Sequence, residues 1–300
     1  MNRPGTRRAL IINRRALRSM PLPAADAGAD KDARGRVLVI GGSASVPGAA
    51  LLAGVAALRA GAGKLQIATV RAAAPGLALS VPEALVVGLN ATRAGEIDPR
   101  RAGASVRPHA MAADAVLIGP GMLVGRAVYQ LIATVRDMLG SEATLILDAA
   151  AVLALRGHEH VLAPLGGRAI ITPHAGEMAT LLGVDKAEIE SDPPAAARFA
   201  AERLGAIVVL KGAESWIGDP AGRMLRYDGG SVGLATSGSG DTLAGIIAGL
   251  AARGAAPIEA AAWAVWAHGS AGERLARRMG TIGFLARELL AEVPALVGRG

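Results

Sequence analysis

The chain has 300 residues, 52% of them hydrophobic, which is enough to bury a substantial core in one large domain or two small ones. Aromatic residues make up only 2%, which argues against base stacking on exposed rings, and the absence of cysteine excludes disulfides, thiolate metal sites and a cysteine nucleophile. No apolar run reaches the roughly 18–20 residues that span a bilayer. We therefore expect a cytoplasmic protein.

The formal charge of +7 comes mostly from residues 1–20, which contain six arginines and no acid. The other 26 basic side chains nearly balance the 25 acidic ones, so the rest of the chain lacks the basic surplus of a nucleic-acid-binding domain. This start could be a targeting segment or an anchor for an anionic surface, but its apolar stretch, 9–12, is too short for a secretory signal. We expect residues 1–34 to form a solvated basic tail, with 1–20 dispensable for catalysis, and residues 35–300 to form a single domain.

Short β-rich runs alternate with Ala/Leu-rich helical segments up to residue 210. The expected strands are residues 37–40, 65–70, 84–87, 115–118, 144–147, 169–171 and 207–210. The expected helices lie near residues 49–60, 125–139, 176–183 and 194–204. This alternation predicts an α/β fold in which a mainly parallel central sheet carries helices on both faces, giving three layers α/β/α.

Most of the expected strands end in a small or functional residue. These strand-end residues are Gly41, Gly119, Asp148, Thr172 and Lys211. Ligands of such sheets bind beyond the carboxyl ends of the strands, so we expect these residues to converge on one crevice.

The pattern changes after Lys211. Residues 215–217 and 223–227 predict a hairpin, because a Gly- and Pro-containing turn separates them. A glycine-rich loop, residues 236–240 (TSGSG), follows, and helical segments near 241–253, 257–278 and 284–296 complete the chain. Consecutive small residues before a helix expose backbone N–H groups at its positive end, which predicts an anion-binding loop.

Asp241 follows this loop directly and has two interpretations. Asp is a favoured N-cap, so the residue could simply begin the helix, with Ser239 sharing that role. Alternatively, its carboxylate is a base beside a bound phosphate and takes a proton from a substrate hydroxyl. The local pattern alone leaves both open.

Two further loops carry candidate site residues. In Thr172-Pro173-His174-Ala175-Gly176-Glu177, His174 and Glu177 could face the crevice, although a lone His is more often a structural loop residue. Lys211 places an ammonium group at a strand end, where it could meet a diphosphate. Together with the 236–241 loop, these loops predict one site that binds an anion and a hydroxyl group.

These segments, in this order, resemble the ADP- or ATP-dependent NAD(P)H-hydrate dehydratases of the ribokinase-like superfamily. The resemblance runs from about residue 35 to 296. It is carried by "GRVLVIGGS", "PGAALLAGVAALRAGAG", "LIGPGM", "TPHAGEM", "VVLKGA" and "ATSGSGDTLAGIIAGL". The last segment indicates only the wider superfamily, whereas "LVIGGS" with "PGAA" and "TPHAGE" points to the dehydratase branch. An additional epimerase domain, present in some members, is not expected here.

The resemblance implies a hydro-lyase that uses ADP or ATP, with Mg²⁺, to phosphorylate the 6-hydroxyl of the S form of hydrated NADH or NADPH. Phosphate would then leave, which restores NAD(P)H and releases AMP or ADP. Asp241 would be the catalytic base. The hydrate would contact Asp241 together with Ala50, Gly121, His174 and Glu177, and the nucleotide would contact the 231–240 loop, including Gly238, Ser239 and Gly240, together with Lys211, Gly212, Ala213, Glu214 and Ser215. No metal ligands are assigned, and a homo-oligomer, with a tetramer as the expected form, is implied.

Three positions depart from the family pattern. Ala150 stands where the family commonly has a second aspartate, Ala175 replaces a usual proline, and Ser237 replaces a usual glycine. Ser237 still offers its amide if its φ is negative.

Two other functions stay open. A kinase of a small alcohol, such as a vitamin precursor, would use the same loop and base but stop at the phosphate ester. A non-catalytic nucleotide sensor, suggested by Ala150 and Ser237, would bind ADP without turnover. Product analysis separates the three, and fold similarity by itself does not.

Overall fold

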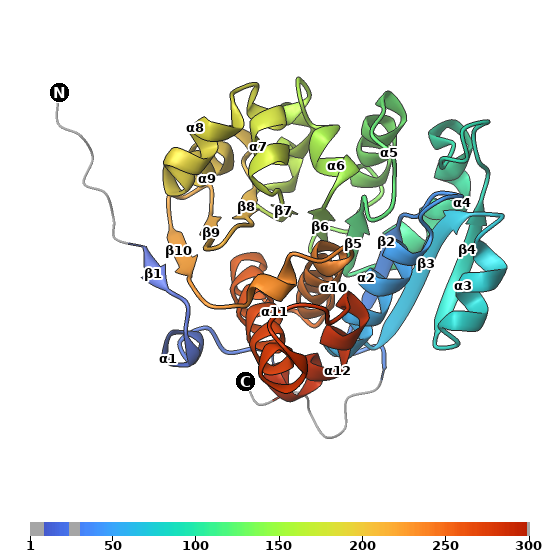
Figure 1. Ribbon diagram of the computed structural model, residues 1–300. Coiled ribbons are helices and arrows are strands. Elements are labelled where there is room, and N and C mark those ends of the chain that lie inside the picture. Colours follow the sequence, from blue (N-terminus) through green and yellow to red (C-terminus); the bar gives the residue numbers. More distant parts are fainter. Residues whose placement is uncertain (1–8, 24–30, 299–300) are drawn as a thin grey trace.

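The computed structural model describes residues 9–23 and 31–298, whose strands form one ten-stranded sheet (Figure 1). In spatial order the strands are β1 (Leu10–Ile11), β10 (Met224–Tyr227), β9 (Ser215–Gly218), β8 (Ile207–Leu210), β7 (Ala169–Ile171), β6 (Thr144–Leu147), β5 (Ala115–Ile118), β2 (Arg36–Ile40), β3 (Lys64–Val70) and β4 (Ala84–Leu89). All neighbours pair in parallel except β9, which is antiparallel to both β8 and β10. The predicted mainly parallel sheet and the 215–227 hairpin are confirmed.

Helices cover both faces of the sheet, as predicted (Figure 1). One face carries α2 (Gly48–Arg59), α3 (Ala74–Ser80), α10 (Ser239–Ala252), α11 (Pro257–Met279) and α12 (Ala286–Val297). The other carries α4 (Pro99–Ala112), α5 (Arg126–Arg136), α6 (Ala150–Leu153), a 3₁₀ helix (Glu159–Leu165), α7 (Ala175–Leu182), α8 (Lys186–Ser191) and α9 (Pro193–Leu204). The result is a three-layer α/β/α architecture.

Small residues let the two central helices of one layer pack closely. α10 lies against α2, and a Cβ atom at Gly245 or Gly249 would collide with the carbonyl oxygen of Ala53 or Ala57. This close approach explains why Ala and Gly, rather than larger apolar residues, dominate both segments. It also fixes the beginning of α10 relative to the sheet.

Residues 9–23 are packed against the protein, which corrects the expectation of a solvated tail for this part of residues 1–34. β1 adds to the edge of the sheet beside β10, α1 (Arg14–Leu17) follows, and Ile12, Leu17 and Met20 are at most 2% exposed. The indole N–H of Trp263 donates to the carbonyl oxygen of Met20 at 2.6 Å. The many arginines of this segment suggested a solvated tail, but three apolar side chains between them join the core. Residues 1–8 and 24–30 of the expected tail lie outside the described residues.

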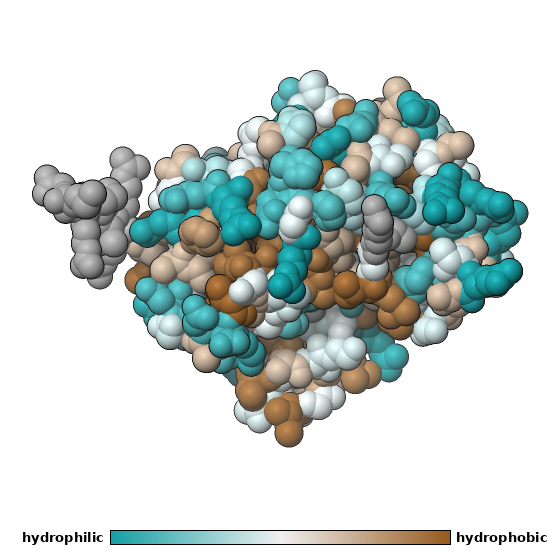
Figure 2. Space-filling view, turned by 90° about the horizontal axis from the view of Figure 1, so that it is seen from above, coloured by the Kyte–Doolittle hydropathy of each residue, from teal (hydrophilic) through white to brown (hydrophobic). Residues whose placement is uncertain are grey.

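The surface carries both polar and apolar side chains. Seen from above, hydrophobic residues form a band across the middle of a largely hydrophilic face (Figure 2). Exposed apolar bands of this kind mark contact sites for ligands or other proteins. None of the described helices combines the length and apolar character needed to cross a membrane.

Candidate active site

The site begins where the strand order reverses. The chain leaves β2 towards β3 and β4, whereas β5 lies on the other side of β2, so the loops after β2 and β5 meet at a topological switch point. The amide of Gly42 donates to the carbonyl oxygen of Pro120 at 2.7 Å. Gly121 has φ +69° and faces the carbonyl oxygen of Val46 so closely that a Cβ atom would collide with it. Ala50, in the first turns of α2, is fully buried, so its side chain packs beneath these loops and is not exposed at the switch point.

A chain of hydrogen bonds links the next three strand ends. Asp148, Thr172 and Lys211 follow β6, β7 and β8, respectively. The hydroxyl of Thr172 donates to Oδ1 of Asp148 at 2.7 Å, and Nζ of Lys211 donates to the same oxygen at 2.9 Å. On the other side, the backbone of Gly119 packs tightly against the carbonyl oxygen of Asp148. Gly119, Asp148, Thr172 and Lys211 therefore lie together at one edge of the sheet, as predicted.

The glycine-rich loop ends at the beginning of α10, beside this chain of hydrogen bonds. Gly238 is the N-cap, with φ +87°, and no side chain caps the helix. A Cβ atom at Gly240 would lie 3.3 Å from Nζ of Lys211, so the ammonium group sits over the first turn. Ser237 is not among the described residues with positive φ, which keeps its backbone in the ordinary range. The Ser239 amide donates to the carbonyl oxygen of Thr236 at 3.2 Å, whereas the next amides of this turn and Lys211 face the same space, which suits a phosphate group.

Asp241 is the third residue of α10 and does not serve as its N-cap, so the capping interpretation is wrong in this structure. Its carboxylate accepts no hydrogen bond within the described part of the chain. Burial raises the pKa of Asp241 to about 6, with a further contribution from the negative charge of Asp148; Lys211 opposes the shift and Glu177 adds to it. A carboxylate that is free and titrates near neutrality has the properties of a general base.

Lys211 stays charged in this environment. Burial lowers its pKa, but the negative charges of Asp148, Glu177 and Asp241 and the hydrogen bond to Asp148 outweigh that effect, so the net pKa shift is upward. Its side chain is 20% exposed, so most of it is buried in the protein.

His174 and Glu177 form a reciprocal cap at the beginning of α7. Nδ1 of His174 accepts from the amides of Gly176 (3.0 Å) and Glu177 (3.2 Å), while Oε2 of Glu177 accepts from the His174 amide (2.8 Å). Because Nδ1 is an acceptor, the neutral ring carries its proton on Nε2, on a side chain that is 59% exposed. His174 is therefore both a structural cap and a potential donor to a ligand. Its backbone forms a parallel bridge with Lys211, which ties the two loops together.

The loop after Lys211 lies at the outer edge of the site. Gly212, Ala213 and Glu214 are exposed, and Ser215 begins β9. The carboxylate of Glu214 pairs with Arg226 at 2.6 Å, which attaches this loop to β10.

Two residues near the site were not foreseen as members of it. His268, on α11, lies 2.9 Å from the hydroxyl of Ser239 through its Nε2 atom. Ala149 has φ 49° and ψ −121°, and it is the one non-glycine residue with positive φ in the described ranges. Strained backbone of this kind concentrates at functional sites. A single His in an Ala- and Trp-rich helix gives no spacing signal, and the dihedral angles of Ala149 have no sequence signature.

No cluster of three or more acidic or His side chains within residues 9–23 and 31–298 could bind a metal ion alone. Mg²⁺ in nucleotide-dependent enzymes is held mainly by phosphate oxygens and water, with one or two carboxylates. Asp148, at the end of β6, and Asp241, in the first turn of α10, place carboxylates beside the glycine-rich turn, which is compatible with that mode of binding.

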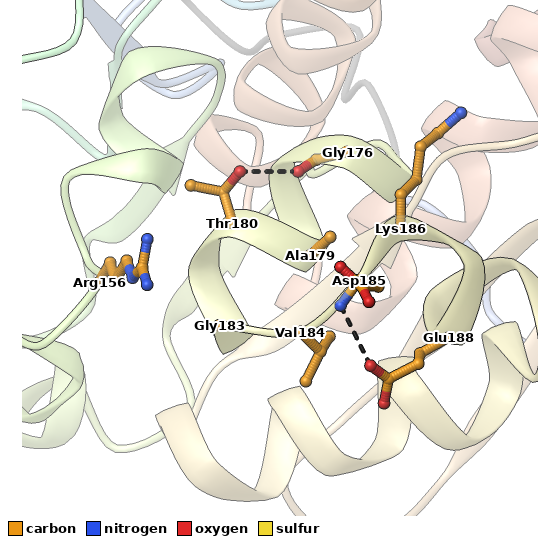
Figure 3. A pocket seen from close by; sticks show the side chains of 9 residues that line it. All are labelled: Arg156, Gly176, Ala179, Thr180, Gly183, Val184, Asp185, Lys186 and Glu188. Atoms are coloured by element: carbon orange, nitrogen blue, oxygen red, sulfur yellow. Dashed lines mark hydrogen bonds between the residues drawn. The ribbon is translucent and has the colours of Figure 1, made fainter.

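A separate hollow of about 530 Å³ lies on the outer surface of α7 and α8 (Figure 3). Arg156, Thr180, Asp185, Lys186 and Glu188 are among its lining residues, and none of the predicted site residues is. In Figure 3 the Asp185 amide donates to the carboxylate of Glu188 (3.1 Å), and the Thr180 hydroxyl donates to the Gly176 carbonyl oxygen (3.0 Å). Both groups therefore already have hydrogen-bond partners in the protein. The candidate active site is therefore defined by the strand ends and not by this hollow.

Solved structures share this architecture. A ribokinase-like superfamily protein from Enterococcus faecalis aligns with 97% of this chain and 96% of its own, with TM-score 0.83 and 27% identity. ADP/ATP-dependent NAD(P)H-hydrate dehydratase from Bacillus subtilis, co-crystallised with ATP and Mg²⁺, aligns with 97% of this chain and 98% of its own, with TM-score 0.79 and 30% identity. Fold and site together define a ribokinase-like protein.

The sequence profile of the NAD(P)H-hydrate dehydratase family matches residues 37–295. The ADP-dependent (S)-NAD(P)H-hydrate dehydratase of Xanthomonas campestris is 49% identical over 292 residues, which are 97% of each chain. The chain belongs to this family, and the resemblance stated from the sequence is confirmed. This chain spans about half the length of the bifunctional NAD(P)H-hydrate repair enzymes that it also matches.

Proposed function

We propose that this protein is a hydro-lyase that repairs hydrated nicotinamide nucleotides. It dehydrates the S form of hydrated NADH or NADPH to NAD(P)H, converting ADP to AMP and phosphate, or ATP to ADP and phosphate. The observation that carries the proposal is Asp241, a free carboxylate with a pKa of about 6 that lies in the first turn of α10, near Lys211. Family membership supplies the substrate class.

The adenine nucleotide occupies the side of the site formed by α10 and β8. Gly238, Ser239 and Gly240 offer amides to its phosphates, Lys211 offers a positive charge, and Gly212, Ala213, Glu214 and Ser215 border the nucleotide. When bound, the nucleotide supplies the phosphoryl group and Mg²⁺ offsets its negative charge. The glycine-rich turn with Lys211 above it supports this assignment, because a helix N-terminus and a neighbouring ammonium group both favour a bound phosphate.

The hydrate occupies the crevice at the switch point. Gly121 allows close approach to the backbone, the exposed Nε2–H of His174 can donate to the substrate, and Glu177 fixes the His174 ring through the reciprocal cap. Ala50, fully buried in α2, lies beside Gly42 at this end of the sheet. Asp241 is adjacent to both ligands and is the last of the proposed substrate-binding residues.

The chemistry then needs few protein groups. Asp241 accepts the proton of the 6-hydroxyl as that oxygen attacks the terminal phosphorus, and the α10 amides with Lys211 stabilise the charge that develops on the transferred group. The lone pair of the ring nitrogen expels phosphate, so no strong protein acid is required. The iminium ion that results loses a proton from C5, which restores the dihydronicotinamide ring. The pKa near 6 leaves Asp241 largely ionised at neutral pH, as a base must be.

The test is an assay of the purified chain with S-hydrated NADH, ADP or ATP, and Mg²⁺. We expect the absorbance of reduced nicotinamide to return together with stoichiometric orthophosphate. Accumulation of a phosphorylated substrate would favour the small-alcohol kinase, and ADP binding without any turnover would favour the nucleotide sensor. Comparison of ADP with ATP and of the two hydrates sets the remaining preferences.

We further propose a cytoplasmic homo-oligomer, with a tetramer as the expected form, and a single catalytic domain over residues 35–300, to which residues 9–23 add an edge strand and three core side chains. Exposed apolar side chains at the sheet edge, Leu10 (41%) and Ile11 (43%), support self-association. Sedimentation equilibrium measures the state, and a monomer at micromolar concentration would contradict the proposal.

A further inference from the structure

Helix α11 holds both ends of the loop that leads into α10. At one end, Oε1 of Glu273 accepts the amide hydrogen of Gly230 at 2.9 Å. At the other, Nε2 of His268 and Oγ of Ser239 are joined by a hydrogen bond of 2.9 Å. Ser239 is the first residue of α10 and only 5% exposed, so its hydroxyl faces α11 and not solvent.

His268 is neutral at physiological pH. Burial lowers its pKa to about 4; a hydrogen bond with the Ser239 backbone opposes this shift, and the charge of Lys211 adds to it. A neutral ring can form a hydrogen bond with Ser239 without adding a second positive charge near Lys211. The mechanism above gives His268 no role, although the residue lies directly behind the phosphate-binding turn.

We infer that His268 is a positioning residue for catalysis: through Ser239 it fixes the first turn of α10, and with it the direction of the amides and of Asp241. The inference rests on the proposed function for its catalytic readout. Asp241 is two residues beyond Ser239 on the same turn, so a rotation at Ser239 displaces the carboxylate as well. A misplacement of about 1 Å in a reacting group can cost about a hundredfold in rate.

Side-chain reach provides a matched test. Glutamine in place of His268 puts an amide near the position of Nε2, and this amide can either donate to or accept from Ser239, so the outcome does not depend on the His tautomer. Asparagine has the same chemistry but ends near the position of Nδ1, too short to reach Ser239. Leucine removes the polar group altogether.

We expect His268→Leu and His268→Asn to lower kcat by about 10- to 100-fold and ADP affinity by about three- to tenfold. His268→Gln should recover at least tenfold of the loss in kcat. Ser239→Ala, which keeps its amide, should reproduce the His268→Leu defect, and the double variant should be no worse than the more impaired single one, because both remove one interaction. Rates are expressed per ADP-binding site titrated by calorimetry, and melting temperatures are recorded alongside, so that loss of folded protein is not counted as loss of kcat.

A folded His268→Leu protein with parental ADP affinity and kcat within twofold would overturn the inference. A His268→Asn protein equal to His268→Gln would overturn it too, as would additive losses in the double variant. If His268→Leu does not fold, the Gln and Asn pair and Ser239→Ala decide. If the parent chain itself shows no turnover, the proposed function fails, and the inference is judged separately by whether ADP affinity falls in His268→Asn and recovers in His268→Gln.

Discussion

Nζ of Lys211 lies 2.9 Å from Oδ1 of Asp148, an oxygen that also accepts the hydroxyl hydrogen of Thr172. The three residues follow neighbouring strands, so the ion pair spans the ends of β6, β7 and β8. Asp148 is only 2% exposed, and these two donors satisfy its Oδ1 oxygen. The pair therefore holds the Lys211 ammonium group over α10 and makes Lys211 part of the folded core as well as of the site.

Replacing Lys211 by Met should weaken ADP binding at least tenfold, because the stem remains and the charge is lost. Stability should also fall, by about 3 kcal/mol, since Asp148 is left buried without its cation. Calorimetric titration with ADP and urea unfolding measure the two effects.

The double variant Lys211→Met/Asp148→Asn separates these effects. It should regain most of the lost stability, because no uncompensated charge remains, but not the ADP affinity. ADP binding by Lys211→Met that equals the parent's would remove Lys211 from the nucleotide site.

The N-terminal segment gives a second pair of variants. Leu17 is fully buried, so Leu17→Ala should cost about 2–5 kcal/mol in unfolding free energy. Arg15 lies two residues earlier and is exposed, so Arg15→Ala should lower the unfolding free energy by no more than about 0.5 kcal/mol. Equal effects in thermal or urea unfolding would mean that the segment does not pack in solution. The same reasoning predicts that deletion of residues 1–20 destabilises the protein, contrary to what their charge suggests.

Sequence predicted the sheet best where burial is most uniform. Strands β5 to β8 are short apolar runs with turn residues on both sides, and their bounds agree with those expected. α4 was missed, because its polar composition and internal Pro108 give little helical signal. In the site, the strand-end rule located Asp148, Thr172 and Lys211. It could not supply the hydrogen bonds between them, nor His268, because those depend on the packing of helices far apart in the chain.

Backbone strain at Ala149 should be measurable. Its φ of 49° and ψ of −121° suit glycine, so Ala149→Gly should stabilise the protein by about 1 kcal/mol, the relief of strain exceeding the added chain entropy. Ala150→Gly, one residue later within α6, is the matched control and should destabilise by a similar amount. Both are measured by urea unfolding with unchanged m-values. A loss of stability in both variants would mean that residue 149 is not strained.

The pH dependence of kcat/KM should report Asp241. As a base it must be ionised in the free enzyme, so the rate should rise with pH through about 6 and level off above it. Lys211 contributes no change over this range, because its pKa is raised. A profile that is flat between pH 5 and 7.5 would contradict the assignment.

Asp241→Asn tests the base directly. We expect this variant to be more stable than the parent although it is less active. The pKa of Asp241 is about 6 in the folded protein and 3.8 ordinarily. Between these values the folded protein binds more protons, so the contribution of Asp241 to stability is complete below 3.8 and is lost as pH rises through about 6. Asn does not ionise, so the variant should exceed the parent by about 1–3 kcal/mol in unfolding free energy at pH 8 and match it at pH 4.

The same Asp241→Asn variant should bind ADP but lose at least about a hundredfold in kcat, because an amide cannot accept the proton of the substrate hydroxyl. A protein that is more stable and less active in this way carries the signature of a strained functional group. Near-normal turnover by the folded variant would exclude Asp241 as the base, whatever its stability. Reduced stability at pH 8 with turnover abolished would instead mean that the carboxylate is held by a favourable contact, and the pKa of about 6 would then be wrong.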